Sequence, residues 1–187
     1  GGITATGGEP MVQIDFLTEL FTESHKRGIN TCLDTSGVTF RPDDPEYLKK
    51  VDKLLEVTDL VMLDIKHINH EEHMKLCKQP NENILAFARY LNDKGIKIWI
   101  RHVVVPTITD KEKYLYELGL FIGQLKMVKA LDMLPYHDMA KKKYKELGMD
   151  YVLKDIPPAT KEQALAARNI VLKGFKESRL KLLEENK

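Results

Sequence analysis

The stretch DLVMLDIK at positions 59–66 decides the fold class. Its apolar run at 60–63 predicts a strand that ends at the polar residues Asp64 and Lys66. Apolar residues at helical spacing stand before this strand (Tyr47, Leu48, Val51, Leu54, Leu55) and after it (Ile84, Leu85, Phe87, Ala88, Leu91). A strand between two helices is typical of a βα repeat, and such repeats build a parallel sheet.

The same alternation continues in both directions along the chain. Further strands are predicted at 3–5, 30–33, 96–105 and 128–134. Further helices are predicted from Phe16 to the C-cap Gly28, from the N-cap Thr109 to Leu125, and from Thr160 onward. The basic stretch at 138–153 is predicted to be a loop with a helical turn, and the charged tail after Phe175 is free to fray. Five units of roughly 25 to 40 residues have the length of barrel repeats but do not close a barrel of eight. We therefore expect one α/β domain over 1–187, whose first strand is either covered or preceded by a missing strand.

Composition excludes several classes of protein. Hydrophobic residues make up 43% and charged residues 30%, which is ordinary for a soluble globular domain. The net charge of +1 gives no general attraction to nucleic acid or to an anionic membrane. The two cysteines, Cys32 and Cys77, lack metal-ligand spacing and favour a reduced compartment. We expect a cytoplasmic protein with neither nucleic acid nor membrane as partner.

Each predicted strand has polar residues at or near its C-terminal end. They are Glu9, Asp34 with Thr35, Asp64 with Lys66, Arg101, and His137. Ligands bind at this end of the sheet in parallel α/β folds, so these residues are predicted to surround one mouth. Any one of these residues has an alternative role as a helix cap or an ion-pair partner. A purely structural role for the residues at all five strand ends is much less expected.

Several of these residues suggest a particular chemistry. Gly7 and Gly8 let a ligand approach the backbone closely, and Glu9 beside them can accept a hydrogen bond from an ammonium group. Asp64 and Lys66 share one face of an extended chain, where they form an ion pair or hold a zwitterion or a diol. Because Asp34 brings a second carboxylate nearby, a small cation is one way to relieve the repulsion.

Other polar residues favour structural roles. Arg101 stands in an apolar strand and needs an anionic partner, either a core carboxylate or a ligand. His67, His70 and His73 are expected to be a solvated helix start rather than a metal site. Cys32 is expected to be a small buried hydrophobic residue.

Five ordered motifs resemble those of the radical-SAM enzymes that activate glycyl-radical enzymes, most of all the pyruvate formate-lyase branch. The motifs are TATGGEP at 4–10, TCLDTSG at 31–37, DLVMLDIKH at 59–67, WIRHVVVP at 99–106 and LPYH at 134–137. The resemblance implies a partial parallel (β/α)6 barrel, of which this chain supplies strands two to six. It also implies S-adenosylmethionine and a [4Fe–4S] cluster as cofactors. The implied partners are a glycyl-radical enzyme, most expected to be pyruvate formate-lyase, and an electron donor such as flavodoxin or ferredoxin.

The resemblance also implies roles for individual residues. Gly7, Gly8 and Glu9 would hold the methionyl amino group of S-adenosylmethionine, and Lys66 its carboxylate. Arg101 would line the methionyl and substrate side, and Val103 and His137 the adenosine side. A monovalent cation would be held by Asp34, Thr35, the Met62 carbonyl and Asp64.

The sequence departs from the family in one major respect. The CxxxCxxC motif of the family precedes the first motif seen here, and neither Cys32 nor Cys77 replaces it. We therefore expect a fragment that lacks the cluster and is inactive alone. Ala140, where the family often has glycine, is a minor departure.

Two alternatives remain open at this point. One is a truncated relative that binds a nucleotide-like ligand or a partner without redox chemistry. The other is an aldolase-like barrel enzyme that uses Lys66 as a Schiff-base amine. The neighbouring carboxylate of Asp64 favours the ammonium form of Lys66, which argues against the aldolase. Coding sequence upstream of Gly1 would separate the fragment from the truncated relative.

Overall fold

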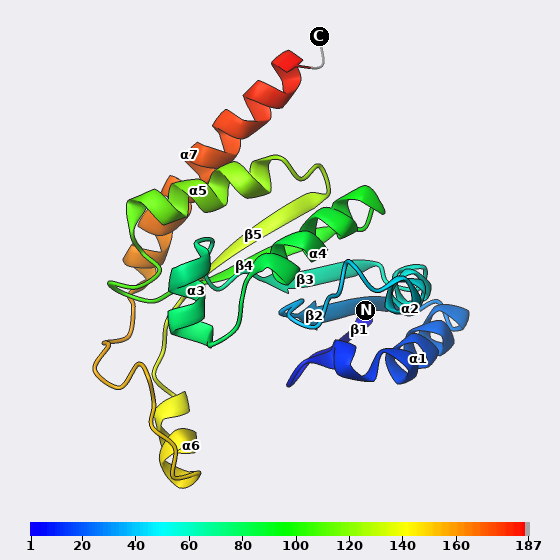
Figure 1. Cartoon of the computed structure of the whole chain (residues 1–187), viewed down its shortest axis with the longest axis horizontal. Helices are drawn as coiled ribbons and strands as arrows, with labels where there is room; N and C mark the ends of the chain where they lie inside the picture. The colour runs from blue at the N-terminus through cyan, green and yellow to red at the C-terminus, as the bar shows by residue number, and fades with distance from the viewer. Residues whose placement is uncertain (186–187) are drawn as a thin grey trace. The chain divides into compact units, whose positions relative to one another are not determined.

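The computed structural model describes residues 1–185 and contains one five-stranded sheet with the order β1-β2-β3-β4-β5 (Figure 1). The strands are β1 (Gly2–Ala5), β2 (Asn30–Thr35), β3 (Leu60–Asp64), β4 (Ile98–Val104) and β5 (Val128–Pro135). The first four strands pair in parallel. This confirms the α/β fold with parallel strands in chain order that the sequence predicts.

Helices separate the strands. They are the 3-10 helix η1 (Pro10–Gln13), α1 (Ile14–Lys26), α2 (Pro45–Leu55), α3 (His70–Cys77), α4 (Glu82–Asp93), α5 (Glu112–Gly123), α6 (Ala140–Glu146) and α7 (Lys161–Glu185). None of the described helices has the length and apolarity needed to cross a membrane. The start of α2 shows how local sequence sets a boundary. The Asp44 carboxylate accepts from the Tyr47 amide at 3.0 Å, and Pro45 occupies the first turn, where it loses no hydrogen bond.

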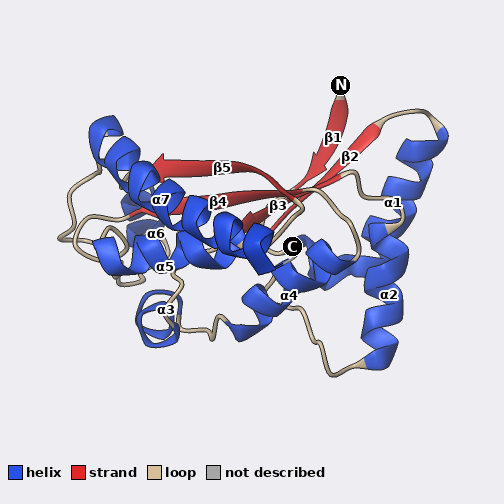
Figure 2. Cartoon of the chain, turned by 90° about the horizontal axis from the view of Figure 1, so that it is seen from above, coloured by secondary structure: helices blue, strands red, loops and turns tan. Residues whose placement is uncertain are grey.

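The described residues form two compact units. The first contains 1–65, 79–101 and 125–131, and the second contains the remaining described residues. In the first unit, helices α1, α2 and α4 lie on one face of the sheet (Figure 2). Alternate strand residues are buried on that face, and Leu33, Leu63 and Ile100 pack in a core with the fully buried Phe21 and Phe87.

The other face of this sheet carries the residues between the buried ones. Cys32, Asp34, Met62, Asp64 and Arg101 are only partly buried, in contrast to their strand neighbours. We call this the open face of the first unit. The prediction that Cys32 is a buried hydrophobic residue is wrong, because its position in the strand turns it to the open face.

The second unit is built around the close pair α5 and α7, which lie side by side in both views (Figures 1 and 2). Their backbones approach at Gly119, Gly123 and Gly174. A Cβ atom added at Gly119 would stand 2.1 Å from the Val171 carbonyl oxygen, and one at Gly174 would stand 2.4 Å from that of Tyr116. Only glycine fits at such a distance.

Three predictions about the second unit are wrong. Thr109 is not a helix cap, because its hydroxyl accepts from the Val105 amide and donates to the Val103 carbonyl, both at 2.8 Å, while α5 begins at Glu112. The described residues after Phe175 do not fray, since α7 continues to Glu185. His67 and His73 are buried, at 1% and 2% exposure, so of the three histidines only His70, at the start of α3, is exposed as predicted.

The outer edge of β1 has no strand paired to it within residues 1–185. Exposed strand edges associate with other strands. We therefore expect this chain to self-associate in sedimentation experiments as its concentration rises, and Thr4→Lys to reduce that association by placing a charge at the edge. Gln13→Lys adds the same charge away from the strand and should leave association unchanged. A chain that stays monomeric at all concentrations would contradict this expectation.

Candidate functional site

The turn Gly7–Gly8 lies at the C-terminal end of β1 and exposes its peptide groups. The φ angles of +89° and +56° place both residues in the left-handed region that favours glycine. A Cβ atom added at either position would meet no atom within 4 Å. The space above the turn is therefore open, and a ligand can reach its carbonyl and amide groups without meeting a side chain.

Glu9 follows the turn and is fully engaged within the protein. Its Oε1 accepts from the Thr35 hydroxyl at 2.5 Å and from the Met11 amide at 3.2 Å. Its Oε2 accepts from the Ser36 amide at 3.0 Å and from the Ser36 hydroxyl at 2.6 Å. A carboxylate offers about four lone-pair sites, so these donors occupy all of them. Glu9 thereby ties the end of the turn to the end of β2.

Arg101 joins two carboxylates on the open face. Its Nε donates to Asp64 Oδ1 at 3.0 Å, and its Nη2 donates to Asp34 Oδ1. Asp64 and Arg101 are register partners in β3 and β4. The three side chains keep 13 to 22% exposure. Burial lowers the pKa of Arg101, but Asp64 and Asp34 outweigh that effect and raise it, so the guanidinium stays charged.

Thr6 extends this ion cluster to the first strand. Its hydroxyl donates to Asp34 Oδ2 at 2.9 Å, so Asp34 receives Thr6 on one oxygen and Arg101 on the other. Hydrogen bonds therefore run from the end of β1 through Asp34 and Arg101 to Asp64. We call Thr6, Asp34, Asp64 and Arg101 the carboxylate–arginine cluster.

The hydrogen bonds of this cluster use side chains that were predicted to bind a monovalent cation. Arg101 already pairs with both Asp34 and Asp64, and the Thr35 hydroxyl donates to Glu9. Within residues 1–185 no group of three or more His, Cys, Asp or Glu residues is placed to hold a metal ion. The predicted cation site, which also includes the Met62 carbonyl, therefore has no support from the geometry.

The structure groups most of the predicted site residues in the first unit. Gly7, Gly8, Glu9, Asp34, Thr35, Met62, Asp64 and Arg101 all belong to it. Lys66, Val103 and His137 belong to the second unit, and their part in a shared site stays a prediction.

Comparison with known proteins identifies the family. A family model described as "Radical SAM superfamily" matches residues 1–119. The pyruvate formate-lyase-activating enzyme of Streptococcus mutans is 46% identical over 91% of this chain and 65% of its own length. That of Listeria monocytogenes is 48% identical over 92% of this chain and 68% of its own length. The chain belongs to the radical SAM superfamily, in the family of the pyruvate formate-lyase-activating enzymes. It spans about two thirds of the length of these relatives.

Two solved structures share the fold. A domain of a pyruvate formate-lyase-activating enzyme from Bacteroides vulgatus superposes with a TM-score of 0.74 at 22% identity, covering 93% of this chain and 94% of that one. Streptococcus suis SuiB bound to its precursor peptide superposes with a TM-score of 0.64 at 16% identity, covering 92% and 36%. At these identities the likeness concerns the fold alone.

Sequence reasoning missed two residues of the candidate site. Thr6 and Ser36 supply the hydroxyls that bind Asp34 and Glu9. Both stand inside the motifs that carry the family resemblance, directly beside a strand-end glycine or carboxylate. A hydroxyl in that position is the signal that would have identified them.

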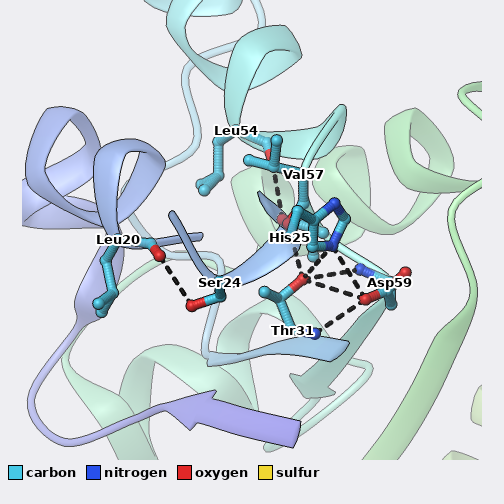
Figure 3. Close-up of polar contacts among 8 residues, drawn as sticks. Leu20, Ser24, His25, Thr31, Leu54, Val57 and Asp59 are labelled. Atoms are coloured by element: carbon cyan, nitrogen blue, oxygen red, sulfur yellow. Dashed lines mark hydrogen bonds and ion pairs between the residues drawn. The ribbon is translucent and has the colours of Figure 1, made fainter. Parts of the chain in front are cut away.

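A second polar cluster, not predicted from the sequence, lies at the opposite ends of the strands (Figure 3). His25 Nε2 lies 3.0 Å from Asp59 Oδ2 and 3.1 Å from the Thr31 hydroxyl. The Thr31 amide donates to Asp59 at 2.8 Å. This amide, aided by His25, holds the pKa of Asp59 below its ordinary value although partial burial raises it. The cluster ties the end of α1 to the starts of β2 and β3, away from the Gly7–Gly8 turn.

Proposed function

We infer that this chain forms the S-adenosylmethionine-binding part of an enzyme that generates a glycyl radical on pyruvate formate-lyase. The observation that carries this proposal is the Gly7–Gly8 turn, which is open above and lies at the C-terminal end of a parallel strand. The names of the relatives support the choice of partner. Flavodoxin or ferredoxin is the proposed class of electron donor.

The residues of the first unit suit the methionyl end of S-adenosylmethionine. Carbonyl groups of the Gly7–Gly8 turn can accept from its ammonium group, and the nearby Glu9 adds negative charge. Lys66 is proposed for the carboxylate, Arg101 for the methionyl and substrate side, and Val103 with His137 for the adenosine, all by family resemblance. Two carboxylates against one guanidinium give the carboxylate–arginine cluster a net negative charge, which favours a cationic ligand.

The residues of this chain do not suit the [4Fe–4S] cluster. Such clusters are held by several cysteine thiolates, whereas this sequence has only Cys32 and Cys77, which belong to different units. In the proposed reaction, the cluster and S-adenosylmethionine would together supply the radical chemistry. The role proposed for the described residues is to bind and orient the cofactor.

Gly7→Ala is expected to weaken S-adenosylmethionine binding by about tenfold, because alanine disfavours the left-handed turn at a cost of about 1 to 2 kcal/mol. Chemical-shift titration suits the weak affinity expected without the cluster. Gly28→Ala is a matched control, since Gly28 also has a positive φ of +67° and open space but lies at the end of α1. Equal affinities for the wild type and Gly7→Ala would refute the proposed binding mode.

A further inference from the structure

The Gly7–Gly8 turn is attached on both sides to the end of one neighbouring strand. Before the turn, Thr6 donates to Asp34 at 2.9 Å. After it, Glu9 accepts from Thr35 and Ser36, which directly follow Asp34. The two glycines themselves have no side chain to hold them, and both are exposed. The rigidity of the turn therefore depends on the residues that flank it.

Glu9 is the stronger of the two anchors. Four donors from Met11, Thr35 and Ser36 occupy its two oxygens. A bound ammonium group would need a lone pair that is already in use, and displacing a backbone amide or a hydroxyl from a carboxylate is costly. Hydrogen bonds to a carboxylate are also the strong ones, so they hold the chain firmly.

We propose that Thr6 and Glu9 are positioning residues, which hold the Gly7–Gly8 turn in its ligand-binding form while the ammonium group of the ligand bonds to the backbone of the turn. The nature of the ligand rests on the proposed function, whereas the attachment of the turn does not. Glu9 thus acts through the conformation of the turn and through its charge, and makes no hydrogen bond to the ligand.

The first test needs no ligand. In the whole chain labelled with ¹⁵N-glycine, the order parameters of Gly7 and Gly8 should be near 0.85 in the wild type and fall below about 0.6 in Ser36→Ala and Thr6→Val. Thr6→Ser keeps the hydroxyl and should restore the wild-type values. Ser24→Ala and Thr22→Val remove hydroxyls that bond only within α1, so they should leave the turn unchanged. Unchanged order parameters in both turn variants would overturn the proposal.

The second test separates a positioning role from direct contact by the direction of the effect. Ser36→Ala frees a lone pair on Glu9 Oε2. If Glu9 positions the turn, the S-adenosylmethionine dissociation constant should rise about fivefold in Ser36→Ala, as expected for one lost hydrogen bond. If Glu9 contacts the ligand, affinity should stay equal or increase, and the proposal fails. A wild type that binds no S-adenosylmethionine would refute the proposed function, while the order parameters would still decide this inference.

Discussion

Replacing Arg101 by methionine is expected to lower the free energy of unfolding by about 3 kcal/mol. The substitution keeps much of the side-chain volume but leaves Asp34 and Asp64 close together without their shared cation. Both carboxylates have less than 20% of their side chains exposed, so water screens their repulsion poorly. Removing one partner of a largely buried ion pair costs more than the pair itself contributes, because a charge is left uncompensated.

Chemical denaturation of the whole chain measures this effect. Arg27→Met, at an exposed residue after α1, is the matched control and should change stability by less than about 0.5 kcal/mol. Adding Asp34→Asn and Asp64→Asn to Arg101→Met should recover most of the loss, because the repulsion disappears with the charges. An Arg101→Met variant as stable as Arg27→Met would show that the cluster is solvated and contributes little.

Gly119→Ala is expected to destabilise the second unit by about 2 kcal/mol. Alanine normally stabilises a helix relative to glycine by about 1 kcal/mol, so the expected sign is the reverse of helix propensity. The reason is steric. The new methyl group would stand 2.1 Å from the Val171 carbonyl oxygen and force α5 away from α7, and overpacking of this kind costs about 1 to 3 kcal/mol or more.

Thermal unfolding of Gly119→Ala can be compared with that of Ala166→Gly in α7. Ala166 is exposed, so its replacement reports helix propensity without packing and should cost about 1 kcal/mol. The two variants exchange the same pair of residues in opposite directions. If close packing decides the outcome, both should be destabilised. A Gly119→Ala variant more stable than the wild type would mean that α5 and α7 approach less closely than described.

The fold was predictable because its signals are local. Apolar runs, turn glycines and strand-end polar residues each act within a few residues, and together they predicted all five strands in order. The hydrogen-bond and ion-pair partners of a side chain cannot be predicted from such local patterns. The sequence left Arg101 between a core ion pair and a ligand contact, and only the register of β3 and β4 places it beside Asp64. Likewise, the sequence shows the carboxylate of Glu9 but not the donors on β2 that occupy it.

The wrong predictions have physical causes of the same kind. Three-residue spacing does not show which histidines are covered, and His67 lies before α3, which begins at His70. The charged chain after Phe175 is rich in lysine, leucine and glutamate, whose helix propensity keeps α7 intact to Glu185.

The carboxylate–arginine cluster also limits which misaligned sheets the chain can form while it folds. Its members come from β2, β3, β4 and the residue that follows β1, and each must turn its side chain to the open face. A slip of β2 or β3 by one residue would rotate Asp34 or Asp64 toward the helices, where a carboxylate would be desolvated without Arg101. Such a sheet would bury a carboxylate and leave the guanidinium of Arg101 without that partner. The cluster therefore penalises incorrect strand alignment, and correctly aligned pairs are favoured before any ligand is present.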